Sequence, residues 1–182
     1  MKRHGLHTIL ITIVISLVIS SCNSKSSSHN NIMTKEIEGF LGEEIVLKDL
    51  IPINLPETYS LSDYLSSEYK IIVYIDSMSC SSCLLNKILP WQKYFESIAD
   101  NSKFMIIFNN PDVFHVRDIL AEYKIEVPYF LDVSSNIKKS RNFPQIEVLR
   151  TFLLHNNKVT LVGDPANNKK MMDLYINTIT NP

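Results

Sequence analysis

The sequence predicts an α/β sandwich in which helices flank a mixed central sheet. Two continuous apolar runs, 70–75 and 103–108, are rich in β-branched and aromatic residues, and each precedes a segment with helical apolar spacing. Such runs are typical of parallel strands that are buried on both faces. The chain then closes with two strand-like segments and a helical one. Strands that alternate with helices and end in a hairpin plus a helix indicate this fold class.

The N-terminus has the layout of an export signal. Lys2 and Arg3 precede an almost entirely apolar stretch, Ile9–Ile19, which is too short for a typical membrane-spanning helix. Two small residues then precede Cys22, an arrangement that resembles a bacterial lipobox, in which the cysteine is lipidated. An ordinary signal peptide or an uncleaved anchor is the alternative. We expect residues 1–21 to be a signal peptide and the protein to be lipid-anchored in the bacterial cell envelope, facing the periplasm or exterior.

The rest of the chain reads as a tether followed by one domain. Segment 22–33 begins with a polar run that has nothing to bury, so we expect a lipidated, flexible tether. Residues 34–182 are numerous enough for one domain with a proper core. The formal net charge is −1 at pH 7 without a clustered basic excess, which argues against a nucleic-acid partner.

The elements of the domain are expected in a definite order. We expect a strand at 44–47, a loop and short helix within 55–65, a strand at 70–75, a helix from the cysteine pair onward, a strand at 103–108, a helix at 113–123, a strand at 128–132, a short helix at 136–141, strands at 150–154 and 158–162, and a helix at 168–180. Ser60 or Ser62 can cap the first helix. Pro90 should kink the second helix, and Asn156-Asn157 should form the hairpin turn.

Cysteine usage points to redox chemistry. Of three cysteines, lipidation would consume Cys22, which leaves Cys80 and Cys83 in an exported protein where disulfides persist. If Cys80 lies at a helix N-terminus, unpaired N–H groups and the helix dipole favour its thiolate, the attacking species in disulfide exchange. Cys83 lies one turn further on and can resolve the mixed disulfide.

Two other interpretations of the pair remain. The first is a structural disulfide, although a pair this close constrains little of the unfolded chain. A zinc site would need two more ligands, and the chain has no second CxxC and no closely spaced histidine pair. His115 and His155 are far apart in sequence and are more often surface histidines. We expect no metal, and no cofactor either, because no Gly-rich dinucleotide motif is present.

The residues around the pair resemble the thioredoxin-like superfamily, specifically its exported TlpA-type redoxin branch. The resemblance covers Gly42–Thr180 and rests on 71–74 before the cysteine pair, on 104–108, and on the hairpin 151–154 with 158–163. It implies a thioredoxin-like sandwich with an inserted strand–helix element at 129–141 and a short N-terminal extension. It also implies a membrane-tethered thiol–disulfide oxidoreductase, a reductase or isomerase, that acts on disulfide-bearing exported proteins and takes electrons from a thiol donor.

The chain departs from the family pattern at several positions. The family usually has tryptophan and proline where this chain has Ser79 and Ser82, and aspartate where it has His155. A cis-proline normally precedes the hairpin, at a place that falls here on 148–150 and contains no proline. Val127-Pro128 resembles the cis-proline signature of a plain thioredoxin. That alternative would leave the later hairpin outside the standard topology, so we favour the inserted element.

Two charged residues are candidates for supporting roles. Arg150 would lie near Cys80 and stabilise its thiolate, or it is simply a solvated arginine at a strand start. Asp76 comes four residues before Cys80 and could accept a proton, or it caps a turn.

The missing proline also supports a rival function, a non-catalytic binding or assembly module, and fold alone cannot choose between the two. The residues before Cys80 do not fit the peroxiredoxin motif, and the cysteine spacing does not fit a copper chaperone.

Overall fold

The structure is a computed structural model that describes residues 24–55, 57, 59–76, 81–92, 94, 98, 102–109, 113–125, 127–165 and 168–181. Its contacts divide the chain into two compact units, 1–35 and 36–182. Helix α2 (Ser24–Phe40) begins in the first unit, and all other described elements belong to the second. Across the described ranges, no helix is both long and apolar enough to cross a membrane.

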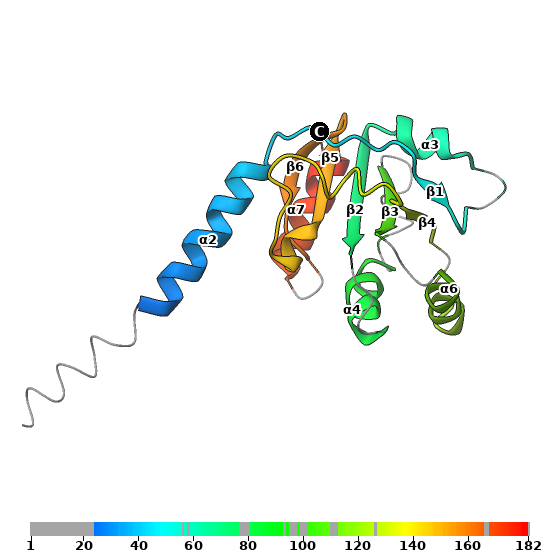
Figure 1. The fold of residues 1–182 in the computed structure, drawn as a ribbon, viewed down its shortest axis with the longest axis horizontal. Helices are drawn as coiled ribbons and strands as arrows, with labels where there is room; N and C mark the ends of the chain where they lie inside the picture. Colours follow the sequence, from blue (N-terminus) through cyan, green and yellow to red (C-terminus); the bar gives the residue numbers. More distant parts are fainter. Residues whose placement is uncertain are drawn as a thin grey trace, which may run out of the picture. The chain divides into compact units, whose positions relative to one another are not determined.

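The second unit contains a mixed sheet of six strands (Figure 1). Their order in the sheet is β1-β4-β3-β2-β5-β6. The strands are β1 (Ile51–Pro52), β2 (Tyr69–Ile75), β3 (Ser102–Phe108), β4 (Tyr129–Leu131), β5 (Thr151–His155) and β6 (Lys158–Val162). The neighbours β2, β3 and β4 run parallel, whereas β1, β5 and β6 pair antiparallel. The predicted mixed central sheet is confirmed.

One face of this sheet is covered by three helices, α4 (Ser81–Gln92), α6 (Val113–Glu122) and α7 (Lys169–Thr180). Alternate residues of β2 and β3 pack against them in one apolar cluster. Trp91 of α4 lies at its centre, 5.4 Å from the Phe104 ring and 5.3 Å from the Tyr175 ring. Because β2 and β3 are buried on both faces, their sequences are continuously apolar rather than alternating.

The opposite face is covered mainly by irregular chain. Helix α3 (Leu61–Ser66) begins at Ser60, which caps it together with Asp63 as expected. Aromatic rings fix this layer to the sheet. The ring pairs are Tyr64–Phe130 at 5.5 Å, Phe40–Phe152 at 5.2 Å and Tyr74–Phe143 at 5.0 Å. Segment 132–150, which ends in the 3-10 helix η1 (Glu147–Arg150), supplies much of the cover.

The sheet order decides between the two interpretations of the proline at 128. Strand β5 lies beside β2, and β4 lies on the far side of β3, so β4 is an inserted strand. No cis peptide bond occurs within the described residues. The thioredoxin-like sandwich with an insertion is therefore confirmed, but the predicted helix at 136–141 is wrong. Those residues form hydrogen-bonded turns, held by bonds such as Lys139 N–H to the Ser135 carbonyl.

Two other predictions differ from the structure. Residues 44–47 form no strand, because only Glu44 makes an isolated bridge, to Lys158. The pairing strand of the N-terminal extension is β1 instead, which lies against β4. The segment expected to be a flexible tether, 22–33, is helical from Ser24 onward. Its polar composition argued against burial, but it does not prevent a helix that continues to the buried Phe40.

The C-terminal elements follow the sequence closely. Asn156 and Asn157 both adopt positive φ, 50° and 64°, as a two-residue type I′ hairpin turn requires. Asn168 caps α7 by accepting the Met171 N–H. Pro90 lies inside α4, one position before the buried Trp91.

Candidate functional site

Four polar residues gather at one edge of the sheet. Strands β2, β3 and β4 are parallel and end there, and each is followed by a polar residue, respectively Asp76, Asn109 and Asp132. Strand β5 runs the opposite way and begins there, next to Arg150, since Thr151 is paired with Val73. We call these four residues the strand-end cluster. The carboxyl ends of strands in α/β sheets are where ligand and catalytic sites usually form.

The cysteine pair belongs to the same edge by its place in the chain. Helix α4 follows β2 and begins at Ser81, the residue after Cys80, and Cys83 is in its first turn. Cys80 and Cys22 lie outside the described residues, and so does the side chain of Cys83. The start of α4 agrees with the helix predicted from the cysteine pair onward. The predicted sulfur chemistry stays a prediction.

Asp76 is bound by two cations. Arg150 Nη1 lies 2.7 Å from Asp76 Oδ1, and Lys138 Nζ lies 3.1 Å from Oδ2. The Arg150 and Asp76 side chains are only 12% and 16% exposed, whereas Lys138 is 45% exposed. The first ion pair is therefore partly shielded from water, and the second is close to solvent. Both predicted supporting residues are at the site, and they are bonded to each other.

The guanidinium of Arg150 is engaged on all three nitrogens. Besides Asp76, it donates from Nε to the Pro144 carbonyl at 3.1 Å and from Nη2 to the Gln145 carbonyl at 2.9 Å. It also lies 5.9 Å from the centre of the Phe143 ring. Arg150 thus ties segment 143–145 to the end of β2. Arg150 is therefore not the solvated arginine of the alternative interpretation.

Asp132 is a site residue that sequence reasoning missed. Its side chain is fully buried and accepts hydrogen bonds from the backbone N–H of Asn136 at 2.8 Å and of Ile137 at 2.9 Å. The hydroxyl of Tyr74, from β2, donates to it at 3.3 Å. These hydrogen bonds hold the turns of residues 132–139 in place. Lys138 belongs to these turns and forms its ion pair with Asp76 from there. An acid directly after a buried apolar strand was the available signal.

Asn109 joins the ends of the three parallel strands. Its backbone N–H donates to the Ile75 carbonyl of β2 at 2.9 Å. Its side-chain amide donates to the Asp132 carbonyl at 2.9 Å and to Ser135 Oγ at 2.7 Å. The edge is therefore held by backbone and side-chain bonds together, which is the kind of rigid support that a positioned site requires.

Burial shifts the pKa of Tyr74, the tyrosine of β2 that donates to Asp132. It raises the pKa of the Tyr74 hydroxyl well above its usual range, and the nearby Asp132 carboxylate raises it further. Tyr74 therefore stays a neutral donor to Asp132.

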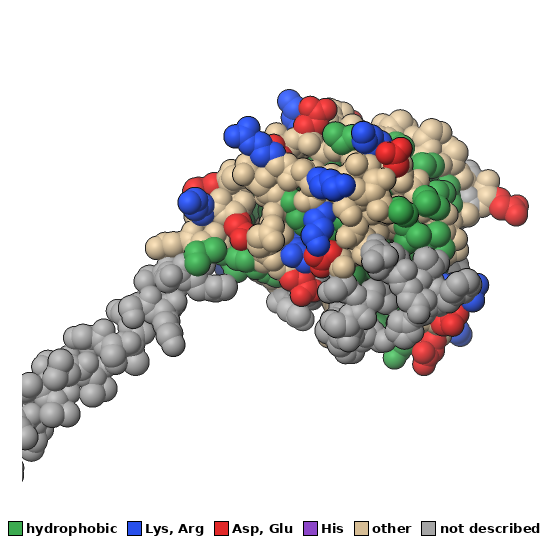
Figure 2. Space-filling model, in the orientation of Figure 1, with side chains coloured by type: hydrophobic (Ala, Val, Ile, Leu, Met, Phe, Trp, Pro, Cys, Tyr) green, Lys and Arg blue, Asp and Glu red, His purple; other side chains and the backbone are tan. Residues whose placement is uncertain are grey.

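Figure 2 shows basic and acidic side chains interspersed on the viewed face of the second unit, rather than one large patch of a single sign. Among the side chains that the structure describes, no group of three or more His, Cys, Asp or Glu could hold a metal ion.

Comparison with known proteins links this architecture to a known fold. No family model and no curated protein matches the sequence. Solved structures do match. One is a candidate protein disulfide isomerase from Bacteroides thetaiotaomicron, with 17% identity, a TM-score of 0.53, and coverage of 78% of this chain and 91% of that one. Another is a thiol-disulfide isomerase from Corynebacterium glutamicum, with 13% identity, a TM-score of 0.51, and coverage of 80% and 99%.

A third match is a cysteine-to-serine variant of PrxQ from Xylella fastidiosa, with 13% identity, a TM-score of 0.52, and coverage of 76% and 96%. At these identities the comparison concerns fold alone. This chain has the thioredoxin-like fold. The match to PrxQ adds nothing to the peroxidase interpretation, because the fold hosts several chemistries.

Proposed function

We propose that this protein is a thiol–disulfide oxidoreductase that acts through Cys80 and Cys83 on disulfide-bearing proteins of the cell envelope. The observation that carries the proposal is the start of α4 at Ser81, directly after Cys80 and at the strand-end edge of a thioredoxin-like sheet. A helix N-terminus favours the thiolate form of a cysteine beside it. The two isomerase-named structures with the same fold agree with this assignment.

The chemistry requires only the two thiols and a partner. The Cys80 thiolate attacks one sulfur of a substrate disulfide, which forms a mixed disulfide and releases the other substrate sulfur as a thiolate that takes up a proton. The Cys83 thiolate then attacks the Cys80 sulfur, releases the second substrate thiol and leaves a Cys80–Cys83 disulfide. A dithiol partner donates two electrons to restore the reduced pair. An isomerase would instead return the mixed disulfide to a different substrate thiol.

Reduction of insulin disulfides by the full-length chain, with dithiothreitol as electron donor, tests the proposal. We expect Cys80→Ser to reduce turnover to near the uncatalysed rate, because the variant lacks the thiolate at the start of α4 that opens the exchange. Ser81→Ala is the matched control, since it changes a neighbouring residue and leaves both thiols in place. Turnover in Cys80→Ser equal to the wild type would refute the catalytic assignment.

Substrates can be identified with a second variant. Cys83→Ser cannot resolve the mixed disulfide, so we expect it to accumulate covalent adducts with exported proteins that disappear on reduction. The double variant Cys80→Ser/Cys83→Ser is the control and should trap nothing. Adducts that form equally well in the double variant would show that another group is responsible.

A non-catalytic binding or assembly module is the second candidate. It is favoured by the segment before β5, where the family has a cis-proline and this chain has Arg150, with no cis peptide among the described residues. The reduction potential of the pair separates the two functions. A potential within the range of known redox proteins, about −120 to −270 mV, supports the enzyme. A disulfide that resists reduction below about −300 mV supports the module.

The membrane tether is part of the same proposal. Cys22 would carry acyl chains, and two or more chains hold a protein stably at a membrane. We expect Cys22→Ala to release the protein into the soluble fraction of the producing cell. Membrane retention of Cys22→Ala would instead indicate an uncleaved N-terminal anchor.

A further inference from the structure

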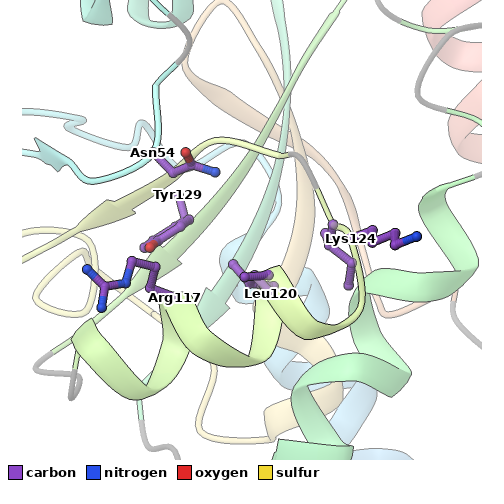
Figure 3. Close-up of a pocket in the computed structure, with 7 residues that line it drawn as sticks. Asn54, Arg117, Leu120, Lys124 and Tyr129 are labelled. Atoms are coloured by element: carbon purple, nitrogen blue, oxygen red, sulfur yellow. The ribbon is translucent and has the colours of Figure 1, made fainter.

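A pocket lies between α6 and β4 (Figure 3). Its volume is about 380 Å³, and it is lined by Asn54, Arg117, Leu120, Ala121, Lys124, Ile125 and Tyr129. This volume is within the range of sites for small organic ligands, about 300–1,000 Å³. Tyr129 is the first residue of β4, whereas Asp132 follows its last, so the pocket and the cluster are at opposite ends of that strand.

The floor of the pocket is apolar and buried. Leu120, Ile125 and Tyr129 are 2%, 3% and 1% exposed. The end of α6 shapes this floor, because Lys124 adopts a positive φ of 52° and the Ile125 N–H donates back to the Leu120 carbonyl at 2.8 Å. This hydrogen bond closes the helix end and turns Ile125 inward. An apolar body of a ligand would be covered by these side chains.

The hydroxyl of Tyr129 is buried, and it has no hydrogen-bond partner among the residues that the structure describes. Buried hydroxyl groups are nearly always satisfied, since burial without a partner costs about 1–3 kcal/mol. In Figure 3 this hydroxyl lies beside the Arg117 side chain, which extends from α6 along the pocket. Burial raises the pKa of Tyr129, and the nearby Arg117 charge opposes that effect. The hydroxyl is therefore a neutral donor for which the described residues supply no acceptor.

Positively charged side chains lie at both ends of the pocket. Arg117 is at the end beside Tyr129, and Lys124 is at the other end (Figure 3). Arg117 also contacts Asp118 at 3.4 Å, but both side chains are more than 60% exposed, so this pair is weak. Asn54 adds a side-chain amide above Tyr129. A hydroxyl donor, a guanidinium and an amide thus converge on one end, and all can donate to an anion.

We infer that this pocket binds a small organic carboxylate with an apolar or aromatic body. Its carboxylate would accept hydrogen bonds from Arg117 and the Tyr129 hydroxyl, and its body would lie on Leu120 and Ile125. Arginine pairs with carboxylates through two parallel N–H bonds, which matches the exposed guanidinium at this end. The site needs neither cysteine, so its occupancy and the proposed redox function can each fail without the other.

Binding of 4-phenylbutyrate to the full-length chain, followed by saturation-transfer NMR and titration, tests the inference. We expect saturable binding with a Kd on the order of 1 mM or tighter, as is usual for a ligand of this size. The matched amine, 4-phenylbutylamine, should bind at least about 10-fold more weakly, because Arg117 and Lys124 repel it. Acetate, which lacks the apolar body, should not compete at the same concentration.

The affinities of variants test whether Arg117 and Tyr129 contact the ligand. Arg117→Gln should weaken 4-phenylbutyrate about 10-fold or more, and Tyr129→Phe about 5-fold, as expected for a charged and a neutral hydrogen bond. Arg141→Gln removes an exposed arginine that does not line the pocket and should leave the affinity unchanged. Absence of saturable binding, equal binding of the amine, or an equal effect of Arg141→Gln would each overturn the inference.

Discussion

Two buried polar groups at opposite ends of β4 behave in opposite ways. Asp132 is 0% exposed and accepts three hydrogen bonds, from two backbone N–H groups and the Tyr74 hydroxyl. Tyr129 is 1% exposed, and its hydroxyl makes no hydrogen bond within the described part of the chain. A satisfied buried group and one without a partner among the described residues thus lie only three positions apart in the chain.

The contrast distinguishes a structural role from a binding role. A satisfied buried carboxylate holds chain in place, and here it holds the turns that carry Lys138 to the candidate redox site. An unsatisfied buried hydroxyl holds nothing within the described structure, and it lines a pocket. Burial alone therefore does not reveal what a polar group is for. Its partners do.

Loss of the Asp132 carboxylate should have the largest effect on stability. Asp132→Ala leaves a part-buried N–H group, a buried one and the Tyr74 hydroxyl without this acceptor, so we expect a loss of about 3–5 kcal/mol in the free energy of unfolding. Denaturant unfolding followed by fluorescence of Trp91, the only tryptophan, measures it. Asp132→Asn keeps one acceptor oxygen and should lose about half as much. A loss below 1 kcal/mol for Asp132→Ala would contradict the structural role.

Breaking the Arg150 contacts should have the next largest effect. Arg150→Ala removes a shielded ion pair and two hydrogen bonds to carbonyl groups, so we expect a loss of about 2 kcal/mol in the same measurement. The control is Lys138→Gln, which removes the exposed cation on the same carboxylate and should cost less than about 0.5 kcal/mol. Equal losses in the two variants would show that shielding from water does not separate these two pairs.

The buried hydroxyl of Tyr74 should make the free energy of unfolding depend on pH in the alkaline range. The pKa of Tyr74 in the folded protein is raised above its usual value of about 10, so the unfolded chain loses this proton first as pH rises. The free energy of unfolding should therefore fall above pH 10, by about 1 kcal/mol for this group by pH 11. Tyr74→Phe should flatten that decline in urea unfolding followed by circular dichroism. The exposed Tyr123, changed to Phe, is the control and should leave the slope as it is.

Loss of the Tyr129 hydroxyl should have the smallest effect. Tyr129→Phe removes a buried donor that has no partner in the described ranges, so we expect the free energy of unfolding to stay within about 0.5 kcal/mol of the wild type, or to rise. The measurement is the same denaturant titration without ligand. A loss above 1.5 kcal/mol would mean that this hydroxyl is satisfied in the folded protein and would weaken the pocket assignment.

The sequence predicted the fold well where local signals were strong. The runs that became β2 and β3 are continuously apolar, and the Asn156-Asn157 turn has a distinct local signature. The helix at 136–141 was wrong because its residues are held by the Asp132 carboxylate, a contact that spacing does not show. The prediction of a strand at 44–47 was wrong because the segment that pairs with β4 lies later in the chain, at β1.

The candidate site was predicted in part. Asp76 was singled out because it comes four residues before Cys80, and Arg150 because it lies at the start of a predicted strand. Their ion pair depends on which strands are neighbours in the sheet, and their supporting roles stay predictions. Asp132 and the Tyr129 pocket were missed, because both depend on burial and partners rather than on a motif. Residues that contact one another across 58 positions, as Tyr74 and Asp132 do, leave no local pattern.

The proposed redox function depends most directly on the nucleophilicity of Cys80. The pH dependence of alkylation by iodoacetamide measures it, in a Cys22→Ala/Cys83→Ser variant in which Cys80 is the only thiol. Because the thiolate is the reacting form, the midpoint of the rate profile gives the pKa of Cys80. We predict a midpoint below about 7.5, since a helix start favours the thiolate. A midpoint at or above about 8.5, the value of an unperturbed cysteine, would contradict the account.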